Sequence, residues 1–394
     1  MFEFLSKYFH FQWDKQRIVY QIMIDRFAND SRFPKNKDNC TPPPFRGGNI
    51  KGIINRLDYI TGLGANSILL SPFFKSNAYH GYHCTTAMNE IESQFGNEDD
   101  IQRLVKLIKK QKMTCGADFV PNHCHISNPI YSEHSDWFEF PCKEYKFYAN
   151  IKDLPVLNLD NPDAREHMIK QALQLCEWGF NYIRIDHATG PSYSFLHELR
   201  MQVKRKYKNV RLIGEVVGEM DFKPLVCKRY TDNLNDKWSE QEARQYEYVG
   251  ILDGVLDYEY YGIIKDALLQ DMPIKNNKAL KRRVEKHFSR YPKDFELWLF
   301  LDNHDVDRIL YFCKNIDKVK EVLDFTYSWK RPVVIYYGTE QGMSNKTAIH
   351  QVAYDDESIR QCMDWNNINK NVFKTIYPCR INEKTHFAQL YFGK

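Results

Sequence analysis

The 394-residue sequence lacks a C-x-x-C motif, although it contains ten cysteines. This absence argues against a thiolate metal site or a dithiol redox centre. Cys115 and Cys176 lie in strand-like and helix-like runs, where a buried free thiol is the ordinary interpretation. We therefore expect a thiol-reduced, cytoplasmic protein.

Long apolar runs and an excess of one charge are also missing. No segment approaches the ~18 apolar residues of a membrane span. Glu3 and Lys7 interrupt the aromatic N-terminal stretch, so that it does not resemble a secretory leader. The 55 basic and 51 acidic residues give a net charge of +4, too near neutral for a nucleic-acid-binding surface. The sequence predicts neither a membrane nor a nucleic-acid partner.

The sequence does contain a regular alternation of short apolar runs with amphipathic stretches. Hydrophobic residues make up 43%, enough for a full core. Apolar positions return at three and four residues within 101–108 and 164–178, which predicts helices. Eight strand-helix units predict an α/β fold, a (β/α)8 TIM barrel. The predicted strands are 17–24, 66–71, 113–120, 182–185, 210–213, 251–256, 297–301 and 332–337.

One long gap divides the predicted barrel. Residues 121–160 are rich in His, Asn, Pro and aromatics, lack a helical period and are too long for an ordinary loop. We expect a catalytic barrel formed by 1–120 and 161–345, with 121–160 as a small excursion domain after the third strand. Residues 346–394 show weak alternation and are expected to form a short tail or rudimentary β region.

The fourth predicted strand carries two charged residues, Arg184 and Asp186, at its end. Because side chains alternate along a strand, these two point to one side while Ile183 and Ile185 point to the other. If the apolar side packs under a helix, the guanidinium and the carboxylate share a buried interior. Buried charges are costly without a partner or a function, so this strand end is a candidate site.

Polar side chains also follow other predicted strands. Active sites of this fold lie at the carboxyl ends of the strands, so we expect these residues to converge on one rim. They are Asp118, Asn122 and His123 after strand three, Arg184, Asp186 and His187 after strand four, Glu215 after strand five, and Asn303, His304 and Asp305 after strand seven.

This set of carboxylates, histidines and one arginine indicates acid-base and nucleophilic chemistry. Glycoside cleavage needs two carboxylates that face one bond: one protonates the leaving oxygen, and the other attacks the anomeric carbon or activates water. An arginine beside Asp186 would keep that carboxylate ionised. Each residue alone has a simpler interpretation, since a lone Asp is more often a helix cap and a lone His more often structural.

The ordered motifs resemble those of the α-amylase superfamily of glycoside hydrolases (glycoside hydrolase family 13), nearest to its neopullulanase, cyclomaltodextrinase and α-amylase members. The similarity runs in register over roughly residues 17–345. It rests on the segments 19–27 (VYQIMIDRF), 48–53 (GNIKGI), 71–73 (SPF), 80–82 (HGY), 118–123 (DFVPNH), 154–158 (LPVLN), 184–186 (RID), 214–216 (GEV), 303–305 (NHD) and 336–340 (YYGTE).

This resemblance implies hydrolysis of α-glucosidic bonds with retention of configuration. Asp186 would be the nucleophile that forms a covalent glycosyl intermediate, and Glu215 the general acid and then the base for water. Asp305 would bind sugar hydroxyls and stabilise the transition state. Arg184 would orient Asp186 and pair with its charge.

The same resemblance implies four further substrate-binding side chains. His123 and His304 would hydrogen-bond hydroxyls of the sugar being cleaved. Tyr82 would stack under its ring, for which a tyrosine offers a flat apolar face. His80 would lie near its 6-hydroxyl.

Departures from the family pattern bear on both sugar binding and metal binding. Thr189 and Gly190 replace a Lys-His pair that reaches the leaving side of the sugar in many members, so leaving-side binding cannot be carried over. Asn49 replaces an aspartate in a loop that, with Asp30, binds calcium in some relatives, and calcium prefers several carboxylate oxygens. We expect no obligatory metal or other cofactor, although Asn122 remains available as a ligand of a structural calcium ion.

Three functions stay open from the sequence. The first is an α-glucan hydrolase that acts on α-1,4 or α-1,6 bonds of maltodextrins, cyclodextrins or similar substrates. The second is a transglycosylase, in which a sugar hydroxyl replaces water. The third is a non-catalytic amylase-like binding subunit, which would be expected to lose at least one of Asp186, Glu215 and Asp305. Most relatives end in a β-sandwich that covers the barrel, and the short 346–394 region leads us to expect a homo-oligomer.

Overall fold

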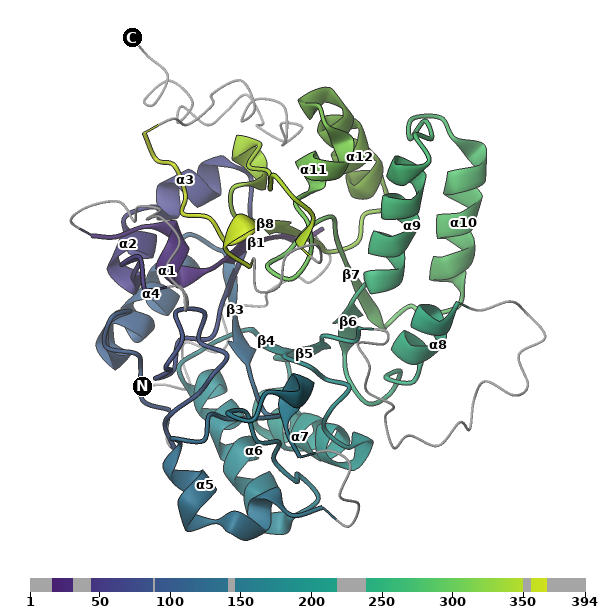
Figure 1. The fold of residues 1–394 in the computed structure, drawn as a ribbon. Helices are drawn as coiled ribbons and strands as arrows, with labels where there is room; N and C mark the ends of the chain where they lie inside the picture. The colour runs from purple at the N-terminus through teal and green to yellow at the C-terminus, as the bar shows by residue number, and fades with distance from the viewer. Residues whose placement is uncertain are drawn as a thin grey trace.

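The computed structural model describes residues 16–30, 44–87, 89–140, 146–217, 239–349 and 356–366. Eight parallel strands form a closed barrel in sequence order, and β8 pairs with β1 to close it. Helices surround the strands (Figure 1). The predicted (β/α)8 TIM barrel is confirmed.

Each of the eight predicted strands is present, with its ends shifted by no more than a few residues. The strands are nearly continuous in apolar residues because the strands of a parallel barrel are covered on both faces. In the pairing of β3 with β4, Asp118 lies beside Arg184. The strands are β1 Ile18–Ile22, β2 Ser67–Leu70, β3 Thr114–Phe119, β4 Tyr182–Ile185, β5 Arg211–Gly214, β6 Gly254–Leu256, β7 Glu296–Phe300 and β8 Val333–Tyr336.

Most of the described helices begin at a residue whose side chain caps them, although α1, α3 and α11 do not. In α4, the side chain of Asn97 accepts a hydrogen bond from the N–H of Asp100 at 3.0 Å. Acidic residues occupy the first turn, where their negative charge interacts favourably with the positive end of the helix dipole. The helices are α1 Ile24–Phe27, α2 Ile50–Ile54, α3 Leu57–Gly62, α4 Glu98–Lys110, α5 Pro129–Glu133, α6 Pro162–Glu177, α7 Tyr193–Lys206, α8 Glu240–Tyr246, α9 Tyr258–Leu269, α10 Lys278–Ser289, α11 Ile309–Cys313 and α12 Ile316–Ser328, with 3-10 turns η1 Ser135–Phe138, η2 Tyr148–Asn150, η3 Thr339–Gln341 and η5 Asp356–Ser358.

Apolar side chains form two cores, one on each side of the barrel wall. The smaller core fills the barrel and contains Trp298, whose ring packs against Tyr182. The larger core lies between strands and helices and includes Ile183 and Ile185. The side chain of Arg184 therefore points into the barrel, as the alternation along β4 predicts.

Two further expectations, buried free cysteines and no membrane-spanning helix, can be compared with the described residues. Cys115 and Cys176 are free and buried, as predicted. None of the described helices is long and apolar enough to cross a membrane.

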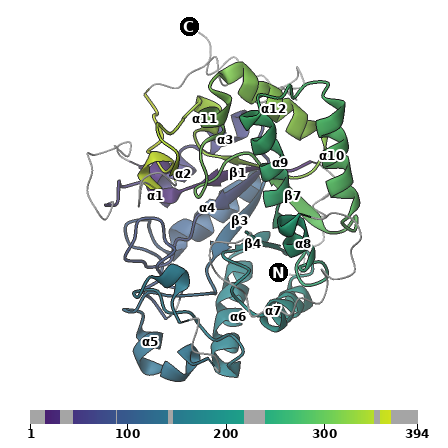
Figure 2. The ribbon, with the colours of Figure 1, turned by 45° about the vertical axis from the view of Figure 1, so that its right-hand side comes forward.

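The segment between β3 and α6 leaves the barrel and carries α5, η1 and η2 (Figure 2). Two isolated antiparallel bridges, His123 with Val156 and Phe147 with Pro155, fold this segment back on itself. The second of these bridges lies next to η2, so the segment returns Tyr148 toward His123 at the barrel rim.

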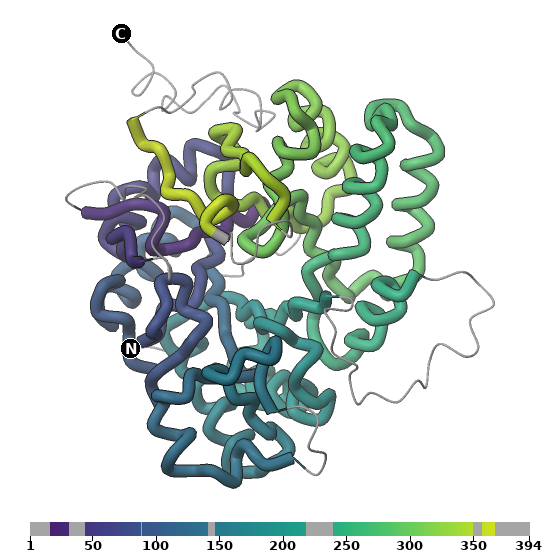
Figure 3. The backbone as a smooth tube through the Cα atoms, in the orientation of Figure 1, coloured from purple at the N-terminus to yellow at the C-terminus, as the bar shows by residue number. Residues whose placement is uncertain are grey.

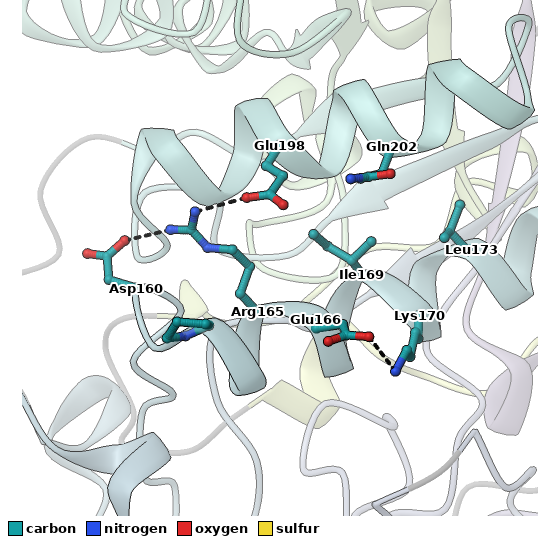
Figure 4. Close-up of a pocket in the computed structure, with 9 residues that line it drawn as sticks. Asp160, Arg165, Glu166, Ile169, Lys170, Leu173, Glu198 and Gln202 are labelled. Atoms are coloured by element: carbon teal, nitrogen blue, oxygen red, sulfur yellow. Dashed lines mark hydrogen bonds and ion pairs between the residues drawn. The ribbon is translucent and has the colours of Figure 1, made fainter.

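Helices α6 and α7 are joined by one arginine (Figure 4). Arg165 Nη2 lies 2.9 Å from Asp160 Oδ1, and Nη1 lies 3.0 Å from Glu198 Oε2 on α7. A hollow of about 530 Å³ between the two helices is lined by these three residues among others. Since it lies on the outer surface of the helices, it is not part of the barrel rim.

The described part of the C-terminal region packs against the barrel beside α1 (Figure 3). Trp365 Nε1 donates to the Phe27 carbonyl at 2.6 Å, and the two rings meet edge to face at 5.0 Å. The N–H of Met363 donates to the Arg26 carbonyl at 2.8 Å. These contacts hold 356–366, and with it Arg360, near the ends of the strands.

Candidate active site

Arg184, on β4, contacts carboxylates from three adjacent strand ends. Nη1 donates to both oxygens of Asp118 at 2.7 Å and to Asp186 Oδ1 at 3.0 Å. Nη2 lies 2.6 Å from Glu215 Oε1, close enough for an ion pair, although its N–H is not aligned for a hydrogen bond. The guanidinium is 1% exposed. One buried positive charge therefore connects the ends of β3, β4 and β5.

Asp118 has a larger part in this site than the sequence indicated. It takes the shortest aligned hydrogen bonds of Arg184 and accepts one from the Tyr82 hydroxyl at 2.7 Å. The Tyr82 oxygen also lies 2.6 Å from His304 Nε2, and the two rings stack with centroids 5.2 Å apart. The available signal was the β3–β4 register, which places Asp118 beside Arg184 but cannot be read from one sequence.

Glu215 follows β5 and accepts two further hydrogen bonds. The N–H of His187 donates to Oε2 at 2.9 Å, and the Tyr258 hydroxyl donates to Oε1 at 3.1 Å. His187 has a φ of 44°, which is uncommon for a residue with a side chain, so this hydrogen bond accompanies an unusual backbone turn. Tyr258 had no predicted role, because it is one of 25 tyrosines and stands outside the recognised motifs.

Asp305 is held by a separate pair of partners. His304 Nε2 lies 3.0 Å from Oδ2, and Arg360 Nη2 lies 3.0 Å from Oδ1. Arg360 Nε also donates to the His304 carbonyl at 2.8 Å, and the Gln21 amide nitrogen lies 3.2 Å from His304 Nδ1. Sequence reasoning missed Arg360, because it lies in the 346–394 region, which shows neither a clear period nor a recognised motif.

His123 lies beside a tyrosine of the excursion segment. Its ring stacks on Tyr148 with centroids 4.2 Å apart, and Tyr148 meets the edge of the His187 ring at 4.8 Å. His123 is 2% exposed, and its Nε2 has no hydrogen-bond partner among the described residues. This nitrogen is therefore available to a ligand hydroxyl.

His80 contacts Tyr82, another of the predicted residues. The Tyr82 N–H donates to His80 Nδ1 at 3.1 Å, and the two rings lie 5.5 Å apart. Contacts between the predicted residues thus connect Arg184 with Asp186 and Glu215, and Tyr82 with His80, His304 and then Asp305.

The carboxylates differ in their electrostatic surroundings. Burial and then the neighbouring Glu215 raise the pKa of Asp186 well above its ordinary value, although Arg184 opposes the rise. For Asp305, burial raises the pKa, but His304 and then Arg360 more than offset it, and the pKa falls below the usual range. Arg184 divides its charge among three carboxylates, so the expectation that it alone keeps Asp186 ionised is incomplete.

The loop of Asp30 and Asn49 does not fit a calcium ion. Asn49 Oδ1 accepts from the Gly52 N–H at 2.7 Å, and Nδ2 donates to Asp30 Oδ1 at 3.2 Å. An amide N–H therefore faces the carboxylate where calcium would need an oxygen. Asn122 is the other expected calcium ligand, and its side-chain oxygen lies close against the backbone of Gly190: a Cβ added at Gly190 would lie 2.0 Å from Asn122 Oδ1. Among the described residues, no group of three or more His, Cys, Asp or Glu is placed to hold a metal.

We expect chelation to leave the melting temperature unchanged within about 1 °C, because Asn49 presents an amide N–H to Asp30 where a stabilising calcium ion would need an oxygen. Differential scanning calorimetry in excess EDTA and in excess calcium chloride measures this. A fall in EDTA that calcium reverses would show that a calcium site exists.

Comparison with known proteins identifies the family. A family model described as "Alpha amylase, catalytic domain" matches residues 21–171 and 130–390. Alpha-amylase 2 of Dictyoglomus thermophilum is 31% identical over 341 residues, which cover 84% of this chain and 56% of the relative. The intracellular maltogenic amylase of Bacillus subtilis is 27% identical over 385 residues, which cover 91% and 60%. The chain thus spans roughly six-tenths of the length of these curated relatives.

A solved structure shows the same similarity. The α-amylase of Geobacillus thermoleovorans, in complex with acarbose, is 28% identical, has a TM-score of 0.72, and the match covers 91% of this chain and 77% of that chain. The family model extends over far more than half of the sequence and includes Asp186, Glu215 and Asp305. The chain belongs to the α-amylase catalytic-domain family.

Proposed function

We propose that the protein is a retaining glycoside hydrolase that cleaves α-glucosidic bonds in maltodextrin-type oligo- or polysaccharides. The observation that supports this most is that one guanidinium contacts both Asp186 and Glu215. Retaining glycosidases need carboxyl groups about 5–5.5 Å apart, whereas inverting enzymes need about 6.5–9.5 Å. Two carboxylates that contact nitrogens of the same guanidinium must lie near one another, as both steps of the retaining reaction require.

In the first step, a carboxylate oxygen of Asp186 attacks the anomeric carbon as the bond to the leaving oxygen breaks. Glu215 gives its proton to that oxygen, so the leaving sugar departs with a neutral hydroxyl. The hydrogen bond from Arg184 favours the ionised form of Asp186, whereas the contact of Arg184 with Glu215 is not aligned. The first step requires the proton on Glu215 and an ionised Asp186, so the hydrogen bond from Arg184 has to act against the burial and the neighbouring charge that raise the pKa of Asp186.

In the second step, the ionised Glu215 takes a proton from water as the water oxygen attacks the anomeric carbon. The bond to Asp186 breaks, and the product keeps the configuration of the substrate. Asp305 stays ionised because its pKa is lowered, so it can stabilise positive charge on the sugar ring. The free Nε2 of His123 supplies one hydrogen-bonding group for a hydroxyl.

The products from maltoheptaose and pullulan test this function. Hydrolysis predicts saccharides shorter than the substrate and none longer. Products longer than maltoheptaose would show the transglycosylase, in which a sugar hydroxyl attacks in place of water. No conversion, together with measurable binding of maltoheptaose, would show the non-catalytic binding subunit and contradict the proposal.

Replacing Arg360 with Gln should lower kcat/KM on maltoheptaose by roughly tenfold, because Asp305 loses a charge-assisted hydrogen bond at a partly exposed position. The loss should grow as the pH falls, since without Arg360 the pKa of Asp305 rises. Initial rates from pH 4 to 7 measure both effects. Arg103→Gln, on the exposed face of α4, is the control and should match the unmodified protein. Equal rates for Arg360→Gln and Arg103→Gln would show that Arg360 has no role in the reaction.

The name of one relative extends the proposal to location. The Bacillus subtilis relative is named an intracellular maltogenic amylase, and we infer an intracellular location for this protein as well. Fractionation of the native cells into cytosol and medium measures it.

A further inference from the structure

A second buried charged cluster lies beside β6, outside the residues that would touch the sugar. His287 of α10 is 1% exposed. Its Nε2 lies 3.0 and 2.9 Å from the two oxygens of Asp257, and its Nδ1 lies 2.9 Å from Glu242 Oε1 on α8. A ring nitrogen can donate to a carboxylate only when it carries a proton. Two such contacts therefore indicate an imidazolium that bridges two carboxylates.

The groups around this ring favour its charged form. Burial lowers the pKa of His287, but Asp257 and then Glu242 raise it to about 9. The carboxylate of Glu259 on α9 also interacts electrostatically with the ring. Two arginines face the carboxylates: Arg290 of α10 forms an ion pair with Glu242, and Arg331, in the segment before β8, interacts electrostatically with Asp257. The ring of Tyr291 packs against His287 with centroids 5.3 Å apart. His287 is thus charged through neutral pH and adds stability there, which is lost as the pH rises through about 9.

Asp257 is the corner between β6 and α9, and its contacts tie that corner to three other elements. Its carboxylate caps α9 by accepting from the Tyr260 N–H at 3.0 Å, and it accepts from the Gln245 amide of α8 at 3.1 Å. Its N–H donates to the Trp298 carbonyl of β7 at 2.9 Å. With His287 from α10, the corner is held by α8, α10 and β7.

The residue after this corner reaches the candidate active site. Tyr258 donates its hydroxyl proton to Glu215 Oε1 at 3.1 Å and accepts from Asn303 Nδ2 at 3.2 Å. The ring is buried and packs edge to face on Phe300, with centroids 4.8 Å apart. Because Asp257 and Tyr258 are adjacent in the chain, a shift of the corner moves the hydroxyl that contacts Glu215.

We propose that His287 is a positioning residue for the general acid: by bridging Asp257 and Glu242 it fixes the corner from which Tyr258 holds Glu215. This inference rests on the proposed function, in which Glu215 is the acid. It assigns a role in the reaction to a charged group that contacts neither the substrate nor Glu215 itself.

The hydrogen bond from Tyr258 to Glu215 has a predictable effect on proton donation by Glu215. A hydroxyl that donates to a carboxylate stabilises the ionised form, so loss of the Tyr258 hydrogen bond should let Glu215 keep its proton to higher pH. Tyr258→Phe should therefore move the alkaline limb of the kcat/KM profile upward by roughly half a unit to one unit. His287→Gln, which keeps a polar side chain but removes the charge, should move it in the same direction by a smaller amount.

A double-mutant cycle tests whether His287 acts through Tyr258. His287→Gln should shift the alkaline limb when Tyr258 is present and should add nothing in the Tyr258→Phe background. Asp257→Asn removes the carboxylate at the corner and should act like His287→Gln, which keeps the test open if that variant folds poorly. Val284→Ala, a buried apolar change on the same helix, is the control: it should lower the melting temperature without moving the limb.

A second readout does not depend on activity. Carbon-13 NMR follows the titration of the Glu215 carboxyl, assigned by comparison with Glu215→Gln, and its midpoint should move with the same pattern across the cycle. If the unmodified protein cleaves no glucan, the proposed function fails while this titration still tests the inference. An equal shift from His287→Gln in both backgrounds, no shift in either, or a shift in Val284→Ala as large as that in His287→Gln, would overturn it.

Discussion

Replacing Asp186 with Asn should lower kcat on maltoheptaose by roughly 10⁴-fold or more, because the amide cannot form the covalent intermediate. The variant should stay folded and become slightly more stable, since the neutral side chain removes one of three carboxylates that share the charge of Arg184. Rate assays at matched protein concentration and a thermal melt measure the two effects.

Asp99→Asn is the matched control, because this aspartate lies exposed in the first turn of α4. It should keep the full rate. Activity of Asp186→Asn within a few fold of the control would show that Asp186 is not the nucleophile.

Replacing Arg184 with Gln should have the largest effect on stability. The change leaves Asp118, Asp186 and Glu215 buried without their shared counter-charge, which costs about 3–5 kcal/mol for a buried pair that loses one partner. Cleavage should also become undetectable, because Asp186 loses the hydrogen bond that favours its ionised form. Urea denaturation at pH 7 and the same rate assay measure these effects.

The pH dependence of this loss identifies its cause. Without Arg184 the pKa values of Asp118 and Asp186 in the folded protein rise further, so the penalty is present above the ordinary aspartate pKa and shrinks as the pH falls through the raised values. Arg103→Gln, an exposed change on α4, should lose little stability at any pH. A loss for Arg184→Gln that stays constant from pH 7 to 4 would show that the carboxylates do not depend on this charge.

The barrel could be predicted because its signal is local. Apolar runs the length of a strand alternate with helical periods along the whole chain, and each predicted strand is present. The alternation along 182–185 also placed Arg184 inside and Ile183 outside. Both patterns follow from side-chain direction within one element.

The missed residues depend on contacts between distant elements. Arg360 meets Asp305, which lies 55 residues earlier in the chain, and Tyr258 meets Glu215 across 43 residues. The periodicity of apolar residues along the sequence gives no information about contacts between residues this far apart. Asp118 was visible as a rim residue, but its dominant contact with Arg184 follows from the β3–β4 register.

The electrostatics of the site could be predicted only in part. A sequence shows that Arg184 is two residues from Asp186, but not that the same guanidinium also contacts Asp118 and Glu215. The number of carboxylates per positive charge decides where a proton is held, and that number is a property of the folded site.

The anomeric form of the first product tests the central claim most directly. Proton NMR of maltoheptaose during the first minutes of cleavage, before mutarotation, should show the new reducing end as the α-anomer, because attack by Asp186 and then by water inverts the carbon twice. A product released as the β-anomer would contradict the account.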